Sequence, residues 1–287
     1  MTDTAASLPL PPGVTLGTDH GAEAVLVDLP VATAVLHLNG AHLTSWVPAG
    51  SSDLLWLSPT SAFGDSAAIR GGIPLVAPWF GPGRRSDQEV KHGWVRNVRW
   101  DLMAAEADGD EVLLRLASPA SRTELSAQLE VRIGSELALD LTITAGEAPL
   151  EVEAALHTYL AVSDVRQIRI QGLGGAGYLD NTRGLAADVL PEGDLTLEGP
   201  TDRIVDRAQE VRILDPGAGR TIVSAPRGTA RTVVWNPWTD LVTGMADIPD
   251  EAWPEFVCIE PAVAKEAAVA LGDGDSLSLG VTYRLES

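Results

Sequence analysis

Cysteine and long apolar runs are nearly absent from this sequence. Cys258 is the only cysteine among 287 residues, so no internal disulfide can form. No apolar run approaches the roughly 18 residues that a membrane-spanning helix needs. The first residues, MTDTAASLPLPPG, lack the basic start and the apolar core of a secretion signal. We therefore expect a cytoplasmic chain that does not contact membranes.

Basic residues are also scarce. Lys and Arg number 20 against 40 Asp and Glu, which gives a formal net charge of −20 at pH 7. A chain of this charge repels the phosphate backbone of nucleic acids and anionic lipid surfaces. The rest of the composition is that of a globular protein, with 45% hydrophobic residues available for a core. The composition therefore predicts no nucleic-acid partner and directs attention to small molecules.

Helical periodicity is weak, whereas short strand signals recur between turns marked by 28 Gly and 19 Pro. The strand signals lie at residues 24–29, 33–38, 112–117, 168–170, 231–235, 256–259 and 276–283. Many short strands with few helices predict an all-β fold, a sandwich or a barrel. The length is compatible with one domain over residues 1–287, of which residues 1–15 form an irregular N-terminal segment.

The clearest single element is a hairpin. Apolar residues alternate with polar ones from Leu125 to Ile133, a turn follows at Gly134-Ser135, and alternation resumes from Leu137 to Ile143. Successive side chains of a strand point to opposite faces. We therefore expect two paired strands with one buried face.

The charge balance reverses locally between residues 66 and 100. This stretch holds six cations against two acids, a balance of 6 − 2 = +4; the cations are Arg70, Arg84, Arg85, Lys91, Arg96 and Arg99. A solvated basic loop is the commoner explanation for any one of these charges. The neighbouring glycines allow close backbone approach and the aromatics offer faces to a sugar ring, a combination that favours an anion site.

Two further segments carry titratable groups in strand-like surroundings. Alternation from Glu151 to Tyr159 places His157 on the face opposite Leu156, although a lone histidine is more often structural. Glu260 ends an apolar strand immediately before Pro261, where an exposed strand-end carboxylate is the commoner case. In a partly buried cleft, desolvation would instead raise the pKa of Glu260 from roughly 4.3 towards neutrality and suit it to accept a proton.

The segment AIRGGIPLVAPWFG, followed by HGWVRNVRW, resembles the paired signature of the hexose-6-phosphate mutarotase branch of the aldose 1-epimerase superfamily. The resemblance continues in chain order through NGAHLTSWVP, LLWLSP, ALHTYLAVSD, GLGGAGYLDNT, TDRI, VVWNPW and FVCIEPA. It implies a large, mostly antiparallel β-sandwich of the galactose mutarotase type. It also implies an isomerase that interconverts the α and β anomers of a hexose 6-phosphate such as glucose 6-phosphate, with no cofactor and no metal. We expect a monomer.

The resemblance assigns catalytic roles to residues that the motifs contain. Mutarotation needs one group to remove the proton of the anomeric hydroxyl and another to protonate the ring oxygen. By resemblance Glu260 is the base and His157 is the acid. His92 and Arg70 would donate hydrogen bonds to the sugar oxygens as charge shifts.

The resemblance also assigns groups to the rest of the substrate. Arg96 together with Arg70 is the expected phosphate contact, because a guanidinium can bind two phosphate oxygens at once. Asp202, in TDRI, matches the acceptor for a sugar hydroxyl, whereas the sequence alone equally allows a turn carboxylate paired with Arg203. Val205 stands where an aromatic often follows DRI, and residues 239–241 lack a lysine that is common after NPW. Both departures from the family pattern bear on which sugar is preferred and on whether a phosphate is required.

Other classes stay open at this point. A non-catalytic carbohydrate-binding sandwich could use the eight Trp but would not need His157 and Glu260 together, and an aldose 1-epimerase acting on free sugars would need no phosphate contact. A glycoside hydrolase would require two carboxylates, of which Glu260 and Asp202 are a weak candidate pair. A zinc enzyme has little support, because the five His show no His-x-His or His-Glu-x-x-His spacing and Cys258 stands alone.

Overall fold

The computed structural model describes residues 8–64, 67–119 and 124–286, and its regular structure is almost entirely antiparallel β-sheet. An outer sheet has the order β13 (Arg169–Gln171), β17 (Val211–Asp215), β18 (Arg220–Arg227), β22 (Ser276–Glu286), β9 (Leu137–Ala145), β8 (Leu125–Ile133), β7 (Glu111–Ala117) and β6 (Asp101–Asp108). This architecture confirms the expected all-β class.

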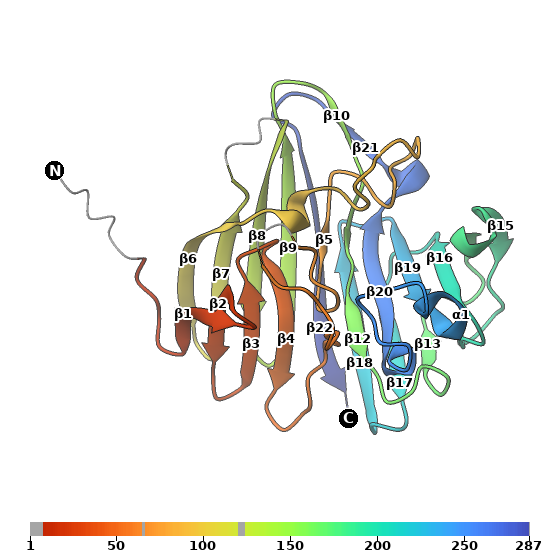
Figure 1. Ribbon diagram of the computed structural model, residues 1–287, viewed down its shortest axis with the longest axis horizontal. Coiled ribbons are helices and arrows are strands. Elements are labelled where there is room, and N and C mark those ends of the chain that lie inside the picture. The colour runs from red at the N-terminus through yellow and green to blue at the C-terminus, as the bar shows by residue number, and fades with distance from the viewer. Residues whose placement is uncertain (1–7, 65–66, 120–123, 287) are drawn as a thin grey trace.

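A second large sheet, called here the site sheet, has the order β15 (Ala186–Val189), β14 (Gly177–Asp180), β16 (Thr201–Val205), β19 (Arg231–Asn236), β20 (Phe256–Val263), β11 (Ala154–Leu156) and β5 (Leu75–Val76), with β12 (Tyr159–Ala161) also paired to β20. Two smaller sheets complete the molecule: β1 (Val14–Asp19), β2 (Ala22–Asp28), β3 (Ala32–His37) and β4 (His42–Pro48) in that order, and β10 (Leu150–Val152) paired with β21 (Val269–Leu271). In Figure 1 the N-terminal strands lie at one end of the molecule and the site sheet at the other.

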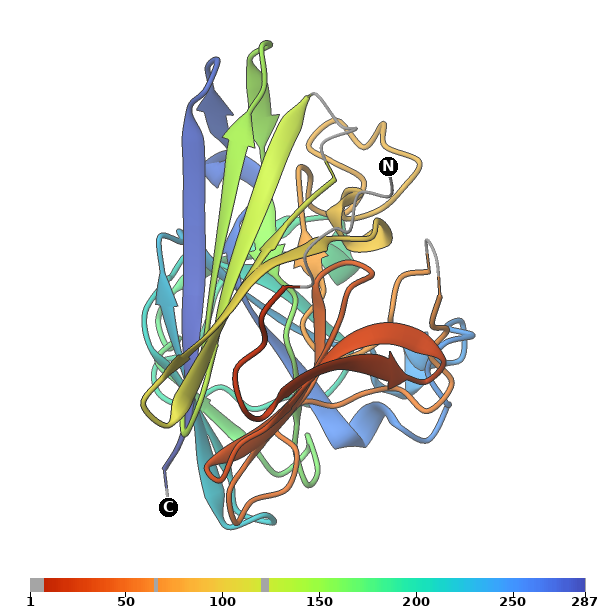
Figure 2. The same ribbon diagram turned by 90° about the vertical axis from the view of Figure 1, so that its left-hand side faces the viewer.

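The sheets pack face to face around one main core. Figure 2 shows the long strands of the outer sheet along one side and the N-terminal sheet opposite them. The alternation in the predicted hairpin explains this packing: β8 and β9 pair from Leu125 opposite Ala145 to Ile133 opposite Leu137, and their apolar residues are buried. The other predicted strand segments also coincide with strands. Strand β1 begins at Val14, and residues 1–7 lie outside the described part of the chain.

Helical structure is confined to short turns. It consists of α1 (Trp238–Val242), η1 (Val95–Asn97), η2 (Asn181–Arg183), η3 (Trp253–Glu255) and η4 (Lys265–Ala267). The weak helical periodicity of the sequence predicted this scarcity. Among the residues that the structure describes, no helix has the length and apolar character needed to cross a membrane.

Candidate active site

Strand register brings the candidate residues onto one face of the site sheet. Trp235 on β19 lies opposite Cys258 on β20 and opposite Asp202 on β16, so these three form one row across the sheet. Val233 lies opposite Glu260, two residues further along each strand. Because residues two apart share a face, Asp202, Trp235 and Glu260 all point to the same side. Side chains that are distant in sequence therefore meet there.

Glu260 lies inside a strand, which corrects the expectation that it ends one. Strand β20 continues to Val263, although Pro261 cannot donate a hydrogen bond. The N–H of Ile259 donates to the carbonyl of Thr158 at 3.2 Å, and alternation turns the nitrogen of Pro261 to the same side. On that side the pairing is interrupted between β11 and β12, so the missing donor removes no ladder bond. The proline is thus compatible with a central strand at this position.

His157 and Glu260 form a buried pair at that interruption. His157 Nε2 lies 3.5 Å from Glu260 Oε1, and the two residues are 8% and 1% exposed. His157 Nδ1 and Glu260 Oε2 have no hydrogen-bond partner among the described residues. Burial, reinforced by the charge of Asp202, raises the pKa of Glu260 well above its usual value. Burial, reinforced by the neighbouring His92, lowers the pKa of His157 well below its usual value.

A chain of contacts holds His157 in position. Its ring stacks on Tyr159 with centroids 5.0 Å apart and planes 13° from parallel, and the edge of Trp235 adjoins it at 6.0 Å. The Tyr159 hydroxyl accepts a hydrogen bond of 2.8 Å from Arg70, whose Nε donates to Asp247 at 2.9 Å. Asp247 therefore orients Arg70, and Arg70 orients the tyrosine on which His157 rests.

His92 reaches the same place from a loop. Its backbone φ of 66° is left-handed, and the following Gly93 passes so close to the carbonyl of Ala77 that a Cβ would collide with it. Gly81 donates its N–H to His92 Nδ1 at 3.3 Å, so the imidazole is neutral with its proton on Nε2. Burial, then the charge of Arg96, lowers the pKa of His92 to about 3. His92 is therefore a neutral donor beside His157, at a centroid distance of 5.5 Å.

A pocket of about 480 Å³ opens above the pair. All six candidate residues line it: Arg70, His92, Arg96, His157, Asp202 and Glu260. Asp202 accepts a hydrogen bond of 2.7 Å from Asn181, whereas Arg203 lies over the ring of Tyr178, so the alternative Asp202–Arg203 pair is not formed. Of the eight Trp, Trp235 is the one in the pocket lining, which leaves little aromatic platform for a pure binding module.

The cations of residues 66–100 divide into two groups. Arg70, Lys91 and Arg96 line the pocket. Arg96 donates to the carbonyl of Lys91 at 2.8 Å, and its buried Nε has no partner among the described residues. Arg84 instead binds Glu151 and Glu266 outside the pocket, at 2.9 and 3.0 Å. Half of the six cations in this stretch therefore line the pocket.

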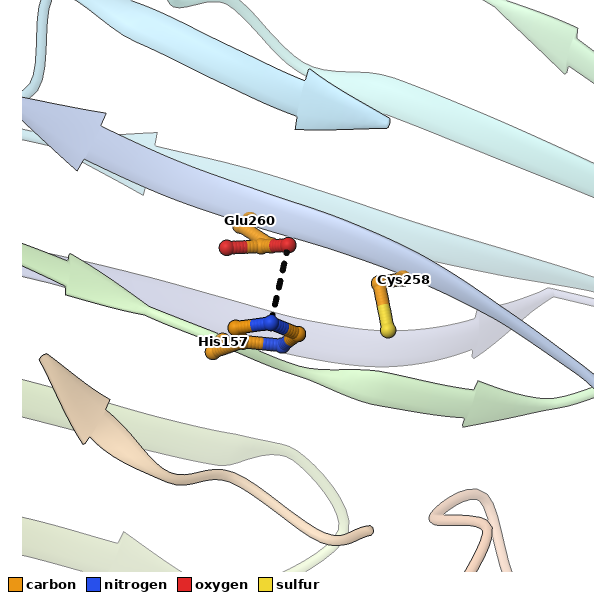
Figure 3. A group of neighbouring side chains, drawn as sticks. All are labelled: His157, Cys258 and Glu260. Atoms are coloured by element: carbon orange, nitrogen blue, oxygen red, sulfur yellow. Dashed lines mark ion pairs between the residues drawn. The ribbon is translucent and has the colours of Figure 1, made fainter. Parts of the chain in front are cut away.

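Several functional candidates escaped the sequence analysis. Lys265 lines the pocket from the turn after β20, and Glu153 accepts hydrogen bonds from the N–H groups of Lys265 at 2.7 Å and Phe80 at 3.1 Å, which ties two lining loops together. Cys258 lies beside the His157–Glu260 pair in Figure 3, close enough to form a potential metal-binding group with it. The spacing Cys258-x-Glu260 on a strand was the available signal for a shared face.

A desolvated carboxyl group paired with an imidazole in a pocket over an antiparallel sheet is typical of an enzyme that moves protons on a polar small molecule. The comparison with known families makes this specific. The chain belongs to the aldose 1-epimerase family, whose family model matches residues 26–284.

Individual relatives agree with this membership. A protein of Escherichia coli named "Putative glucose-6-phosphate 1-epimerase" is 34% identical over 250 residues, covering 84% of this chain and 83% of its own. A protein of the same name from Cenchrus ciliaris is 29% identical, covering 93% and 86%. A crystal structure titled as a putative mutarotase from Salmonella typhimurium superimposes with a TM-score of 0.89 at 29% identity, covering 98% of this chain and 96% of the other.

Proposed function

We propose that this protein interconverts the α and β anomers of a hexose 6-phosphate, with glucose 6-phosphate as the first substrate to test. One observation carries the proposal: the His157–Glu260 pair lines a pocket that four cations of an otherwise acidic chain also line, namely Arg70, Lys91, Arg96 and Lys265. Family membership supports the epimerase chemistry, and the names of the E. coli and Cenchrus relatives support the phosphate.

In the proposed reaction the catalytic pair keeps one proton throughout. Glu260 takes the proton of the anomeric hydroxyl while the protonated His157 gives its proton to the ring oxygen, and the ring C–O bond breaks. The resulting aldehyde turns about its bond to the next carbon. Reversal of both transfers closes the ring on either face. The reaction needs no redox step, because electrons only shift between the C–O bonds of the substrate.

The pKa shifts of the pair correspond to the ring-opened stage of this cycle. Burial raises the pKa of Glu260 and lowers that of His157, so both shifts favour the carboxyl group as the holder of the shared proton. The separation of 3.5 Å between Nε2 and Oε1 is slightly longer than a hydrogen bond. A small movement would form that bond and return the proton to His157, which readies the pair for the next cyclic sugar.

Fixed donors beside the pair would stabilise the developing charge on the sugar oxygens. Arg70 is held by Asp247 and Tyr159, and His92 presents Nε2–H because its Nδ1 already accepts from the backbone. Donors that need no reorientation during the reaction contribute about 3 kcal/mol each in comparable oxyanion sites. We assign them this role.

The phosphate is proposed to bind at Arg96. Its buried Nε has no partner in the described part of the chain, and Lys91 and Lys265 line the same pocket. A phosphate oxygen would supply the missing acceptor, and charge-assisted bonds of this kind are about twice as strong as neutral ones. Residues 239–241 lack the lysine expected after NPW, and Lys265, from a different segment, supplies a cation to the pocket. Asp202, freed from Arg203, is proposed to accept from a sugar hydroxyl.

Anomer exchange measured by NMR tests the proposal directly. Glucose 6-phosphate, glucose and galactose are compared at catalytic protein concentrations against spontaneous exchange. We expect acceleration for the phosphate above that for either free sugar. Equal acceleration of all three would make the protein a general aldose epimerase, and no acceleration of any would favour a carbohydrate-binding module.

Cytoplasmic location and a monomeric state stay predictions. The first rests on the single cysteine and the lack of long apolar runs. Cell fractionation and analytical ultracentrifugation of the full chain are the corresponding measurements.

A further inference from the structure

Three different ligand-type atoms meet beneath the pocket. Cys258 and Glu260 lie two residues apart on one face of β20, and His157 faces them from the interruption between β11 and β12 (Figure 3). One sulfur, one ring nitrogen and one carboxylate oxygen lie within 4.8 Å of one another, and all three residues are buried. The sugar chemistry proposed above uses the nitrogen and the oxygen but leaves the sulfur without a role.

These side chains keep unused bonding capacity. Glu260 Oε2 and His157 Nδ1, in residues more than nine-tenths buried, have no hydrogen-bond partner among the described residues. Buried polar atoms are normally paired, so unpaired ones in both members of this pair leave bonding capacity for a further partner. Cys258 is a free buried thiol.

We propose that His157, Cys258 and Glu260 bind one soft divalent cation, Zn²⁺ or Cd²⁺, and that this ion excludes the sugar from the catalytic pair. Zinc takes tetrahedral sets of nitrogen, sulfur and oxygen at about 2.0 to 2.3 Å, which places nitrogen and oxygen about 3.4 Å apart. His157 Nε2 and Glu260 Oε1 already lie 3.5 Å apart. The sulfur needs to approach by about 1 Å to reach its own tetrahedral spacing of about 3.6 Å.

The fourth coordination position would open into the pocket. His157 and Glu260 line that pocket, so an ion held between them is reached through it. Three protein ligands with one open position are typical of zinc whose fourth ligand is water or a substrate. The ion would occupy the same two side chains that the sugar needs, so the ion and the sugar compete.

Charge neutrality favours the bound state. Binding releases two protons into solvent, the thiol proton of Cys258 and the proton that the His157–Glu260 pair holds, and the resulting thiolate and carboxylate cancel the 2+ charge. A neutral complex avoids the large penalty for an uncompensated buried charge. The charge of Arg96 opposes the ion, whereas the charge of Asp202, which also acts on Glu260, and the net charge of −20 attract cations.

Metal titration of the full chain tests the site without any assay of activity. Cys258 is the only cysteine, so a thiolate-to-metal absorption band with Cd²⁺ or Co²⁺ has one source. We expect the band to saturate at one equivalent and to vanish in Cys258→Ser and Cys258→Ala, two variants whose thermal unfolding checks the fold. In His157→Ala and Glu260→Gln the metal concentration at half saturation should rise at least about tenfold, since even outer partners of a metal typically matter that much. His20→Ala, at an exposed histidine, is the matched control and should leave titration unchanged.

The claim that the metal excludes the sugar rests on the proposed function, whereas the claim that the three residues bind the metal does not. Glucose 6-phosphate should shift the metal titration to higher concentration, and Zn²⁺ should slow anomer exchange in the native chain but not in Cys258→Ser. A saturable band in a protein that exchanges no anomers would retain the metal site and remove the sugar-phosphate function. Absence of the band, or an unchanged band in both His157→Ala and Glu260→Gln, would overturn the proposed metal site.

Discussion

Replacing Glu260 by Gln tests whether this side chain acts as the general base, because the variant should keep the fold and the substrate affinity. The amide keeps the size of the side chain but cannot accept the anomeric proton. Removal of a general base typically slows a reaction by about 10² to 10⁴, or about 3 to 5 kcal/mol of transition-state stabilisation. We therefore expect Glu260→Gln to bind the sugar phosphate with little change and to lose anomer exchange by this factor.

The same substitution should not destabilise the protein at neutral pH. Burial raises the pKa of Glu260, so between its unfolded and folded pKa values the folded chain holds a proton that the unfolded chain has released. Folding stability due to this group is full below the unfolded pKa and is lost as pH rises through the folded pKa. The amide does not titrate. The melting temperature of Glu260→Gln, relative to the native chain, should therefore increase from acidic to neutral pH.

Glu153 supplies the matched control, because it is also buried but is hydrogen-bonded at both oxygens. Glu153→Gln replaces one acceptor of the Phe80 and Lys265 N–H groups by a donor. It should lower the free energy of unfolding by about 2 kcal/mol. Thermal unfolding across pH and NMR exchange rates are measured for both variants. Near-native exchange by Glu260→Gln would refute the assignment of the base.

Three further predictions concern the substrate groups and pH. Arg96→Ala should raise the Michaelis constant for glucose 6-phosphate above that for glucose by a differential of about 1.5 to 3 kcal/mol, and equal effects on both would remove Arg96 from the phosphate site. Arg84→Ala, outside the pocket, is its control and should leave both constants unchanged. The pH profile of kcat/KM, corrected for spontaneous exchange, should be bell-shaped, because the catalytic pair works with one proton. The apparent pKa of the acid limb should lie below the usual pKa of histidine, and that of the alkaline limb should lie above the usual pKa of glutamate. A rate that still rises through the alkaline range would contradict this. Asp247→Asn should slow phosphate and free sugar alike, since it loosens Arg70 beside His157; an effect on the phosphate alone would move Arg70 to the phosphate site.

Local sequence patterns predicted the strands but not their neighbours. The alternation of residues 125–143 fixes one buried face, so β8 and β9 were predictable as a hairpin. The central position of β20, between β19 and β11, depends on pairings across about 100 residues and leaves no local signal. The end of β20 was mispredicted because Pro261 normally stops pairing, and only the interruption beside Thr158 explains why it does not.

The site was more predictable than the sheet order, since its residues lie in motifs that carry the family resemblance. All six residues chosen from those motifs line one pocket. The residues that escaped act through non-local contacts: Asp247 through Arg70, Glu153 through two backbone N–H groups, and Lys265 through a turn that follows the predicted strand. Nothing in their immediate sequence distinguishes them from ordinary surface charges.

Polar atoms left unpaired around the pocket support the proposal that these residues bind a substrate. Arg96 Nε, His157 Nδ1 and Glu260 Oε2 are all buried around one pocket without a partner among the described residues. Each such atom lowers the free energy of unfolding by about 1 to 3 kcal/mol. Glu153 carries no such cost, because both of its carboxylate oxygens accept hydrogen bonds. A ligand that brings a phosphate oxygen to Arg96 and hydroxyl groups to the catalytic pair would pair these atoms and remove this free-energy cost. Sugar phosphate should therefore raise the melting temperature of the native chain more than free sugar does, and the difference should shrink in Arg96→Ala.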